Sequence, residues 1–443
     1  MRKIFAAILA ILMLLSLAAC SGERPQETAP ATTTVPEATE VMVGFGAGDV
    51  TASWSVGLDG GDNPYDRMST GIKSNLYIHC LAITDTDGET VLIMSMDAAW
   101  GGWEKYIREK IEEEFGIPKD HVIVSAIHQH STPTHEDKYS NLVREKTVEA
   151  VQQALEDQAP AKMLIGTTET EALNFVRRYY ANDGKNTLVG DNYNHEIGVQ
   201  YGYIGHETEA DNEMRLIKFE RGEDKKPIIM VNFQAHPHMG SAGNDTNQHA
   251  DWPGVMREAL EKELGCYAMY FSGASANINS TSRISEENVS TDWKDHGRRA
   301  AAFVKEGLGN LTEANLGNIK VISQKNAYDA RGGHQKRNLT IGAIAIGDVV
   351  FTYHPYEMFD INGMELRGGT VGNEAYAAED QLENPYPMTF VCTLANGHLG
   401  YVPSILGYTN GGYSANVTKL NTGSGEALVA DYLHLLNELY NAE

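Results

Sequence analysis

Six of the fifteen histidines in this sequence fall in two short stretches. The first stretch, residues 128–135, holds His128 and His130, and the second, residues 236–249, begins with His236. Neutral imidazole is a good ligand for Zn²⁺, so the two stretches together could supply ligands to one metal ion. The alternative is a set of polar loop histidines that hydrogen-bond to backbone groups.

A carboxylate is the expected third ligand of such a metal. A catalytic zinc ion usually takes about three protein ligands and keeps one position for water. The sequence offers Asp97, Asp251 and Glu357, and the pattern of apolar residues does not rank them. A metal held in this way polarises a carbonyl group and lowers the pKa of bound water, which is the chemistry of a hydrolase.

Both histidine stretches follow segments that are expected to be β-strands, residues 121–126 and 228–232. Side chains at positions i and i+2 of an extended backbone point the same way. We therefore expect His128 and His130 to face one cavity at the end of a sheet. Loops at such places commonly carry catalytic residues on a rigid scaffold.

Strand-like and helix-like patterns alternate along the chain from residue 43 onward. This alternation favours sheets covered by helices, an α/β fold of layered mixed β-sheets, with α+β as the alternative. The expected strands also include residues 76–83, 90–96, 267–271 and the β-rich run 341–353. The expected helices are residues 106–115, 142–155, 255–264 and 428–440.

The N-terminus is typical of an export signal. A basic pair precedes an apolar run, residues 4–15, that is shorter than the roughly 20 residues of a membrane-spanning helix. The segment 17–20 (LAAC) resembles the lipobox of bacterial lipoproteins. It predicts a signal peptide over residues 1–19 and a lipid on Cys20. Plain secretion after a small-residue cleavage site is the alternative.

The segment after the lipobox predicts a tether. Residues 20–41 are rich in Pro, Thr, Glu and Ala and hold almost no large apolar side chains, so they are expected to be disordered. One catalytic domain then occupies residues 42–443. We expect an exported cell-surface or periplasmic lipoprotein that meets the membrane through its anchor at Cys20.

Charge and cysteine usage narrow the class of protein. The formal net charge of −25 repels phosphate backbones and anionic headgroups, which argues against nucleic-acid binding. The cysteines after Cys20 are odd in number and widely spaced, so buried free thiols are expected rather than disulfides. These cysteines are Cys80, Cys266 and Cys392.

A series of short segments, in one order along the chain, resembles the neutral ceramidase family. The opening GFGAGDVT resembles that family's G-x-G-x-x-D-[IV]-T, and SAIHQHSTP resembles its S-x-T-H-T-H-S-G-P. The remaining matches are the segments 95–97 (SMD), 235–237 (AHP), 250–254 (ADWPG), 355–357 (PYE), 395–403 (ANGHLGYVP) and 411–413 (GGY). The resemblance covers nearly all of residues 43–443 and implies the fold of the family's catalytic domain.

The resemblance implies a zinc site with four ligands. The family binds zinc through two His, one Glu and one Tyr, and the matching positions here are His128, His236, Glu357 and Tyr401. The alternative for Tyr401 is a tyrosine of the core or of the pocket rim.

The resemblance also implies residues that act beside the ion. His130 would be a proton carrier, because general catalysis favours a group whose pKa lies near the operating pH. Arg177 and Tyr413 would stabilise the oxyanion that develops during hydrolysis. The alternative for Arg177 is a surface cation.

One position departs from the family pattern. Ceramidases carry a serine in G-D-V-S-P-N, and the matching position here is Asn279. An amide cannot serve as a nucleophile in place of a hydroxyl, but it could donate a hydrogen bond to the oxyanion.

The residues and the resemblance together predict an enzyme. We expect a zinc-dependent hydrolase of an amide bond, less readily an ester, in which zinc-activated water is the nucleophile and the substrate is a small or lipid-like N-acyl compound. The alternative is a metal-containing lipoprotein that binds a ligand on the same scaffold without catalysis.

Overall fold

Three β-sheets carry the architecture. The computed structural model describes residues 40–59, 63–241, 245–284, 289–333, 335–368 and 382–442. The first sheet has the order β5 (Val122–Ala126), β4 (Thr90–Met96), β3 (Tyr77–Thr84), β1 (Met42–Asp49), β6 (Ala159–Pro160). The second has the order β15 (Tyr267–Ser272), β13 (Ile228–Phe233), β12 (Glu213–Glu220), β7 (Lys162–Glu169), β17 (Thr312–Ala314). The third has the order β18 (Ile319–Asp329), β19 (Lys336–Ile346), β20 (Val349–Tyr353), β22 (Met388–Cys392).

All three sheets contribute to one central apolar core. Leu81 of β3, Met230 of β13 and Phe351 of β20 are among its buried members. Because central strands such as β4, β13 and β20 are also buried on the other face, they read in the sequence as nearly continuous apolar runs rather than as alternating ones. The core therefore explains why β3, β4 and β13 could be located from composition alone.

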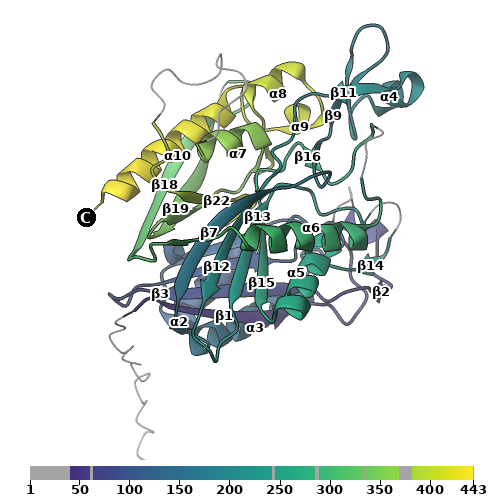
Figure 1. Cartoon of the computed structure of the whole chain (residues 1–443). Coiled ribbons are helices and arrows are strands. Elements are labelled where there is room, and N and C mark those ends of the chain that lie inside the picture. The colour runs from purple at the N-terminus through teal and green to yellow at the C-terminus, as the bar shows by residue number, and fades with distance from the viewer. Residues whose placement is uncertain are drawn as a thin grey trace, which may run out of the picture. The chain divides into compact units, whose positions relative to one another are not determined.

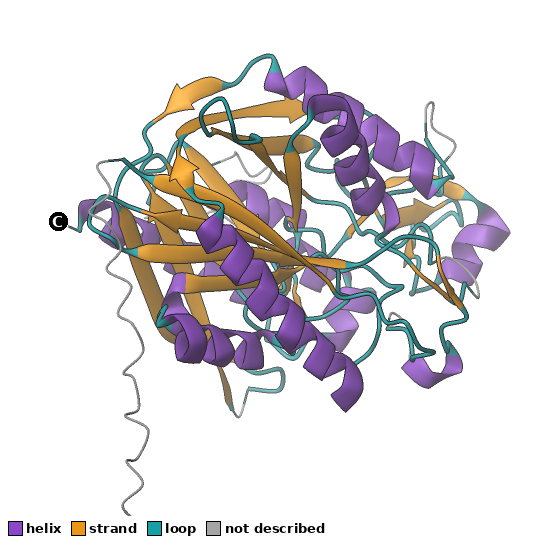
Figure 2. Cartoon of the chain, turned by 90° about the horizontal axis from the view of Figure 1, so that it is seen from below, coloured by secondary structure: helices purple, strands orange, loops and turns teal. Residues whose placement is uncertain are grey.

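Helices cover the outer face of each sheet (Figures 1 and 2). The first sheet packs against α2 and α3, the second against α5 and α6, and the third against α7 and α10. These helices are α2 (Glu104–Phe115), α3 (Asp137–Glu156), α5 (Asp251–Leu264), α6 (Trp293–Leu308), α7 (Asp360–Leu366) and α10 (Ser424–Asn441). The layered α/β fold expected from the sequence is thus confirmed.

The same strand arrangement occurs in each sheet. An antiparallel pair is followed by a parallel strand that is reached through a connection containing a helix: β3–β4 then β5, β12–β13 then β15, and β19–β20 then β22. Parallel neighbours end at the same edge of a sheet, and open α/β sheets bind ligands in the crevice beyond the carboxyl ends of their strands. Each sheet therefore supplies one such edge.

Buried polar side chains join the three edges. Ser95 Oγ of β4 donates to the carbonyl of Tyr270 in the second sheet at 2.6 Å, and Ser125 Oγ of β5 donates to the carbonyl of Thr393 beyond the third at 3.1 Å. Asn232 Nδ2 of β13 donates to the carbonyl of Val391 in β22 at 3.1 Å. The loops that leave the three edges consequently start close together.

A small sheet projects from this body (Figure 1). It has the order β10 (Leu188–Gly190), β9 (Arg178–Ala181), β11 (Tyr203–His206), and α4 (His195–Tyr201) follows its first hairpin. The short pair β8 (Phe175–Val176) and β16 (Ile278–Asn279) lies at its base. Further short elements are β2 (Gly71–Ile72), β14 (Asn247–Gln248), β21 (Glu357–Met358), β23 (Tyr401–Val402), α8 (Ile405–Asn410), α9 (Tyr413–Val417), η1 (Pro64–Asp66) and η2 (Lys119–His121).

The expected elements agree closely with the observed ones, except that one expected strand segment is divided into two strands. The strand expected over residues 90–96 is β4, and the expected helix that ends before Gly116 is α2, whose C-cap glycine has φ 70°. The run 341–353 forms two strands, β19 and β20, because the chain turns at Gly347 with φ 59°. A left-handed glycine is the local cause of that turn.

Several expectations concern segments outside the described residues. The predicted signal peptide (1–19), Cys20 and all but the last two residues of the tether lie there. In the part of the chain that is described, no helix combines the length and the hydropathy needed to cross a membrane. Cys80, Cys266 and Cys392 are buried free thiols, as expected.

A buried histidine between α5 and α6 predicts acid sensitivity. Within the described part of the chain, neither ring nitrogen of His296 has a hydrogen-bond partner, and burial together with Arg299 lowers its pKa to about 3. The unfolded chain takes up this proton below a pKa of about 6.5, so the stability is present above that value and is lost as the pH falls. At pH 4.5 the wild type should lose about 2–3 kcal/mol through this group alone.

Urea unfolding of His296→Phe measures this loss. Between pH 7 and pH 4.5 the free energy of unfolding of His296→Phe should fall by about 2–3 kcal/mol less than that of the wild type. His434→Gln, at an exposed position of α10, is the control and should follow the wild type. Parallel pH profiles for His296→Phe and the wild type would contradict the assignment.

Candidate metal centre

Three side chains from the three sheet edges meet in one buried cluster. His128 follows β5, His236 follows β13 and Glu357 follows β20. Their potential ligand atoms all lie within 4.8 Å of one another. His128 Nε2 lies 3.3 Å and His236 Nε2 3.6 Å from Glu357 Oε2. This cluster, the metal trio below, joins residues that are each more than 100 positions apart in the sequence.

Backbone carbonyls orient both imidazole rings of the metal trio. His128 Nδ1 donates to the carbonyl of Ala99 at 2.7 Å, and His236 Nδ1 donates to the carbonyl of Ile278 at 2.7 Å. A carbonyl oxygen only accepts, so Nδ1 carries a proton in both rings, and Nε2 is the nitrogen that faces Glu357 and could bind a metal. Metal-binding histidines are typically held in this way.

The carboxylate of Glu357 is surrounded only by imidazole rings. Its nearest polar neighbours are His128, His236 and His398, and neither oxygen accepts a hydrogen bond from any other described residue, although the side chain is only 3% exposed. Buried charges are commonly paired or coordinate metals. The carboxylate beside two imidazole nitrogens fits a divalent cation.

The protonation states of the metal trio also suit a metal. Burial raises the pKa of Glu357, but the imidazoles of His128, His236 and His398 outweigh it and hold that pKa well below its usual value. Burial, with Arg177 adding to it, lowers the pKa of His236 to about 3. The carboxylate is therefore ionised and the imidazole of His236 neutral at pH 7, which are the forms that bind a metal.

The backbone at His128 differs from the expected extended conformation. His128 has φ 66°, in the left-handed region, and β5 already ends at Ala126. An extended backbone was expected to place His128 and His130 on one face, and that conformation is not present. The two rings still meet, with Nε2 atoms 3.3 Å apart, because the chain turns at His128.

Tyr401 lies beside the metal trio. The short parallel pair of β21 and β23 sets Glu357 directly opposite Tyr401, and Arg177 Nη2 donates to the Tyr401 hydroxyl at 3.4 Å. Burial and the nearby Glu357 raise the pKa of Tyr401, so its hydroxyl is neutral in the metal-free protein. The position suits the fourth ligand implied by the family resemblance, and that role stays a prediction.

Two neighbours of the metal trio were not predicted. Trp100 packs against the ring of His398 at a centroid distance of 4.6 Å and against His128 at 4.8 Å. His398 Nε2 lies 3.9 Å from Glu357 Oε1, and its side chain is 32% exposed. His398 falls within the ceramidase-like segment 395–403, which was a usable signal, whereas Trp100 gave none.

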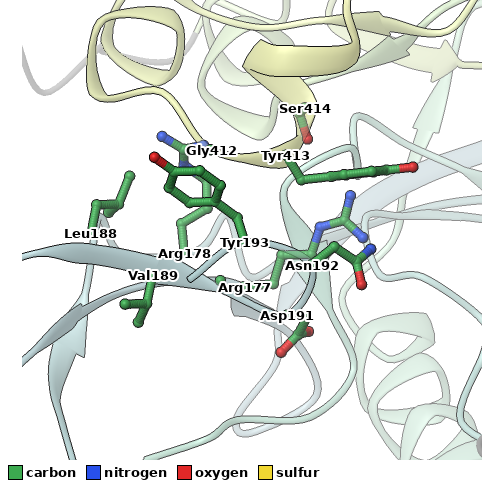
Figure 3. Close-up of a pocket in the computed structure, with 11 residues that line it drawn as sticks. Arg177, Arg178, Leu188, Val189, Asp191, Asn192, Tyr193, Gly412, Tyr413 and Ser414 are labelled. Atoms are coloured by element: carbon green, nitrogen blue, oxygen red, sulfur yellow. The ribbon is translucent and has the colours of Figure 1, made fainter. Parts of the chain in front are cut away.

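Arg177 and Tyr413 lie in a pocket at the base of the projecting sheet (Figure 3). Arg177 is buried, and its Nη2 also donates to the carbonyl of Ala276 at 2.6 Å. Tyr413 is 37% exposed, and its ring centroid lies 5.7 Å from that of Tyr401. Arg177 is thus not a surface cation, and both predicted oxyanion donors lie close to Tyr401.

Asn279 is buried near the metal trio but has a different partner from the expected one. Its backbone forms a parallel bridge with His236, and its Nδ2 donates to the carboxylate of Asp191. A carboxylate only accepts, which fixes the amide orientation. One of the two amide N–H groups of Asn279 is therefore directed to Asp191.

The two other candidate carboxylates have structural partners. Asp97 is fully buried and binds both terminal nitrogens of Arg257, at 2.8 and 2.7 Å. Asp251 begins α5 and accepts from the backbone of Gly240 at 2.6 Å and of Trp252 at 2.8 Å. The structure therefore favours Glu357 over Asp97 and Asp251 as the third ligand, a choice that the sequence left open.

Replacing Asp97 should damage the fold and not the metal centre. Breaking a buried ion pair by removing one partner typically costs about 3–5 kcal/mol, because the other charge stays buried. Asp97→Asn is expected to lose stability of this order in urea unfolding while the folded fraction binds zinc with the wild-type stoichiometry. Loss of zinc from folded Asp97→Asn would show that Asp97 supports the metal directly.

Comparisons with known proteins identify the fold. No protein-family model and no curated protein matches this sequence. A solved structure described as a ceramidase complexed with C2 superposes with a TM-score of 0.69 at 15% identity, covering 90% of this chain and 74% of that one. The neutral ceramidase from Pseudomonas aeruginosa gives a TM-score of 0.67 at 15% identity, with the same coverage. The chain has a ceramidase-like fold.

Proposed function

We propose that this protein is a zinc-dependent hydrolase of an amide bond, or less readily an ester bond. The observation that carries the proposal is the metal trio, in which a buried carboxylate faces two imidazole nitrogens that could share one ion with it. The ceramidase-like fold supports it, because ceramidases hydrolyse an amide bond. The chemistry itself is argued from the residues of the site.

His128, His236 and Glu357 would hold the ion, with Tyr401 as the fourth ligand. A zinc ion bound there supplies a Lewis acid that polarises a carbonyl group and lowers the pKa of water. Two neutral imidazoles and one carboxylate leave the site with a net positive charge when zinc is bound. That charge favours the oxyanion that forms when an amide is attacked.

Arg177 and Tyr413 would stabilise the developing oxyanion. Arg177 keeps guanidinium N–H groups beyond the two bonds it makes to Ala276 and Tyr401, since a guanidinium offers five. Tyr413 offers a phenolic hydroxyl from a partly exposed position. His130, whose ring lies against His128 and His238, would move protons between the nucleophile and the leaving group. Burial and the neighbouring imidazoles hold the pKa of His130 well below its usual value rather than near the operating pH, so its ring starts neutral, as a proton acceptor.

The substrate class is an N-acyl compound. A lipid anchor at Cys20 after removal of residues 1–19 would hold the enzyme at the outer face of a bacterial membrane, where acylated amides occur. Ceramide itself is not assigned as the substrate, because Asn279 stands where ceramidases carry a serine.

A substrate screen with and without metal tests the proposal. Purified protein, stripped with a chelator and then reloaded with zinc, is offered a panel of N-acyl amides and matching esters, and released fatty acid is measured by mass spectrometry. We expect release from at least one amide only in the reloaded sample. Tight zinc binding without turnover of any acyl substrate would favour the binding-protein alternative, and full activity of the stripped sample would reject a metal enzyme.

A further inference from the structure

A carboxylate beside the proposed oxyanion donors has no role in the mechanism above. Asp191 lines the same pocket as Arg177 and Tyr413, and in Figure 3 Arg177 lies between Tyr413 and Asp191. Asn279, whose backbone forms a bridge with His236, donates to the carboxylate of Asp191, so Asp191 lies near the centre rather than at a remote surface. Its side chain is 17% exposed.

The local fold fixes the position of Asp191. It follows β10 in a tight turn that is closed in both directions: Gly190 N donates to Tyr193 O at 2.6 Å, and Tyr193 N donates to Gly190 O at 3.3 Å. Asn279 Nδ2 donates to one carboxylate oxygen and Arg283 Nε donates to the other at 3.0 Å. The backbone and side chain of Asp191 are both held.

The restrained carboxylate still has open acceptor capacity. An ionised carboxylate has about four acceptor sites, and the two hydrogen bonds above use half of them. In the described structure the Oδ1 atom of Asn279, whose residue is 3% exposed, has no hydrogen-bond partner. This wall of the site therefore offers acceptors, while Arg177 across the pocket offers donors.

We infer that Asp191 is a specificity-determining residue that accepts a hydrogen bond from a hydroxyl or ammonium group on the substrate, and that Asn279 is the residue that positions it. The inference rests on the proposed function and narrows it to amides whose amine part carries such a donor. A site built to hydrogen-bond a substrate donor discriminates strongly against an analogue that lacks it, because the acceptor is then left unpaired.

Three amides of one fatty acid test the inference: the N-(2-hydroxyethyl), the N-(2-aminoethyl) and the N-propyl amide. They differ only in the terminal group of the amine part. We expect the first two to have a kcat/KM at least about 10-fold above that of the propyl amide, expressed mainly in KM, since a contact made equally in ground and transition states changes KM. Dissociation constants of the zinc-loaded protein, measured by calorimetry, should show the same order.

Two variants separate Asp191 from Asn279. Asp191→Asn should weaken binding of the aminoethyl amide by about 10-fold or more. Binding of the hydroxyethyl amide should weaken less, because only the ammonium group loses a charge partner. Asn279→Leu, of similar size, should reduce the preference for both while zinc content stays at the wild-type level. Glu196→Gln is the matched control, because it removes an exposed carboxylate from the same projecting sheet region.

The outcomes distinguish this inference from the proposed function. Equal dissociation constants and equal kcat/KM for the three amides would overturn the inference while the enzyme stands. Preferential binding of the donor-bearing amides without release of fatty acid would support the inference and reject the hydrolase. An unchanged preference in Asp191→Asn would overturn the role of Asp191.

Discussion

Glu357→Gln should bind no zinc at concentrations that saturate the wild type, and its release of fatty acid should fall by at least about 10³-fold. Removing the Lewis acid forfeits several kcal/mol of transition-state stabilisation, and each 1.36 kcal/mol corresponds to a factor of ten in rate. Zinc content by atomic emission and turnover of the best amide from the screen measure the two effects.

The same variant makes a second prediction, for stability. In the metal-free protein, despite burial, the imidazoles of His128, His236 and His398 hold the pKa of Glu357 well below its usual value, so the ionised carboxylate adds stability above pH 4.5 and its neutral isostere should unfold at pH 8 with a free energy no higher than that of the wild type. Zinc at 1,000 times its dissociation constant should stabilise the wild type by about 4 kcal/mol and the variant not at all.

Asp360→Asn is the control for this pair of measurements. Asp360 is a buried carboxylate three positions further along the chain, and it accepts from Asn277 Nδ2 at 2.7 Å and from Ile361 N at 2.8 Å. Its variant should keep the zinc stoichiometry of the wild type. If Glu357→Gln retained zinc at the wild-type stoichiometry, Glu357 would not be a metal ligand.

Arg177→Ala should lower kcat by about 10²–10³-fold, the usual cost of removing one oxyanion donor, with zinc content unchanged. The guanidinium is buried beside Tyr401, and its loss leaves a hole of matching shape. Added guanidinium ion at millimolar concentration should therefore restore part of the activity. Steady-state kinetics with and without guanidinium give both results.

The adjacent arginine is the matched control for rescue. Arg178 is paired with Glu207 and donates to the carbonyls of Gly407 and Gly411, so Arg178→Ala should lose stability and gain nothing from guanidinium. Equal kcat for Arg177→Ala and the wild type would remove Arg177 from the mechanism. Loss of zinc from Arg177→Ala would instead assign it to the support of the metal.

Local sequence patterns predicted much of the fold. The strands β3, β4 and β13 and the helices α2 and α10 were located because their apolar residues are continuous or periodic. The meeting of three sheets around one core was not predictable in this way. It depends on contacts between distant strands, such as those of Asn232 with β22, that leave no periodic trace.

The candidate site was likewise predictable where it depends on local sequence and not where it depends on long-range contacts. Residue types alone indicated two histidine stretches, and the resemblance to ceramidases supplied Glu357 and Tyr401. Choosing among the carboxylates required knowing that Asp97 meets Arg257, which lies 160 positions away. The partner of Asn279 was equally hidden, because Asp191 reaches it from a turn of the projecting sheet.

Anomalous scattering from a zinc-soaked crystal tests the central claim most directly. We predict one peak at the zinc absorption edge, bonded at about 2.0–2.2 Å to Nε2 of His128, Nε2 of His236 and a carboxylate oxygen of Glu357. A crystal at saturating zinc with ordered side chains at these three positions and no peak between them would contradict the account.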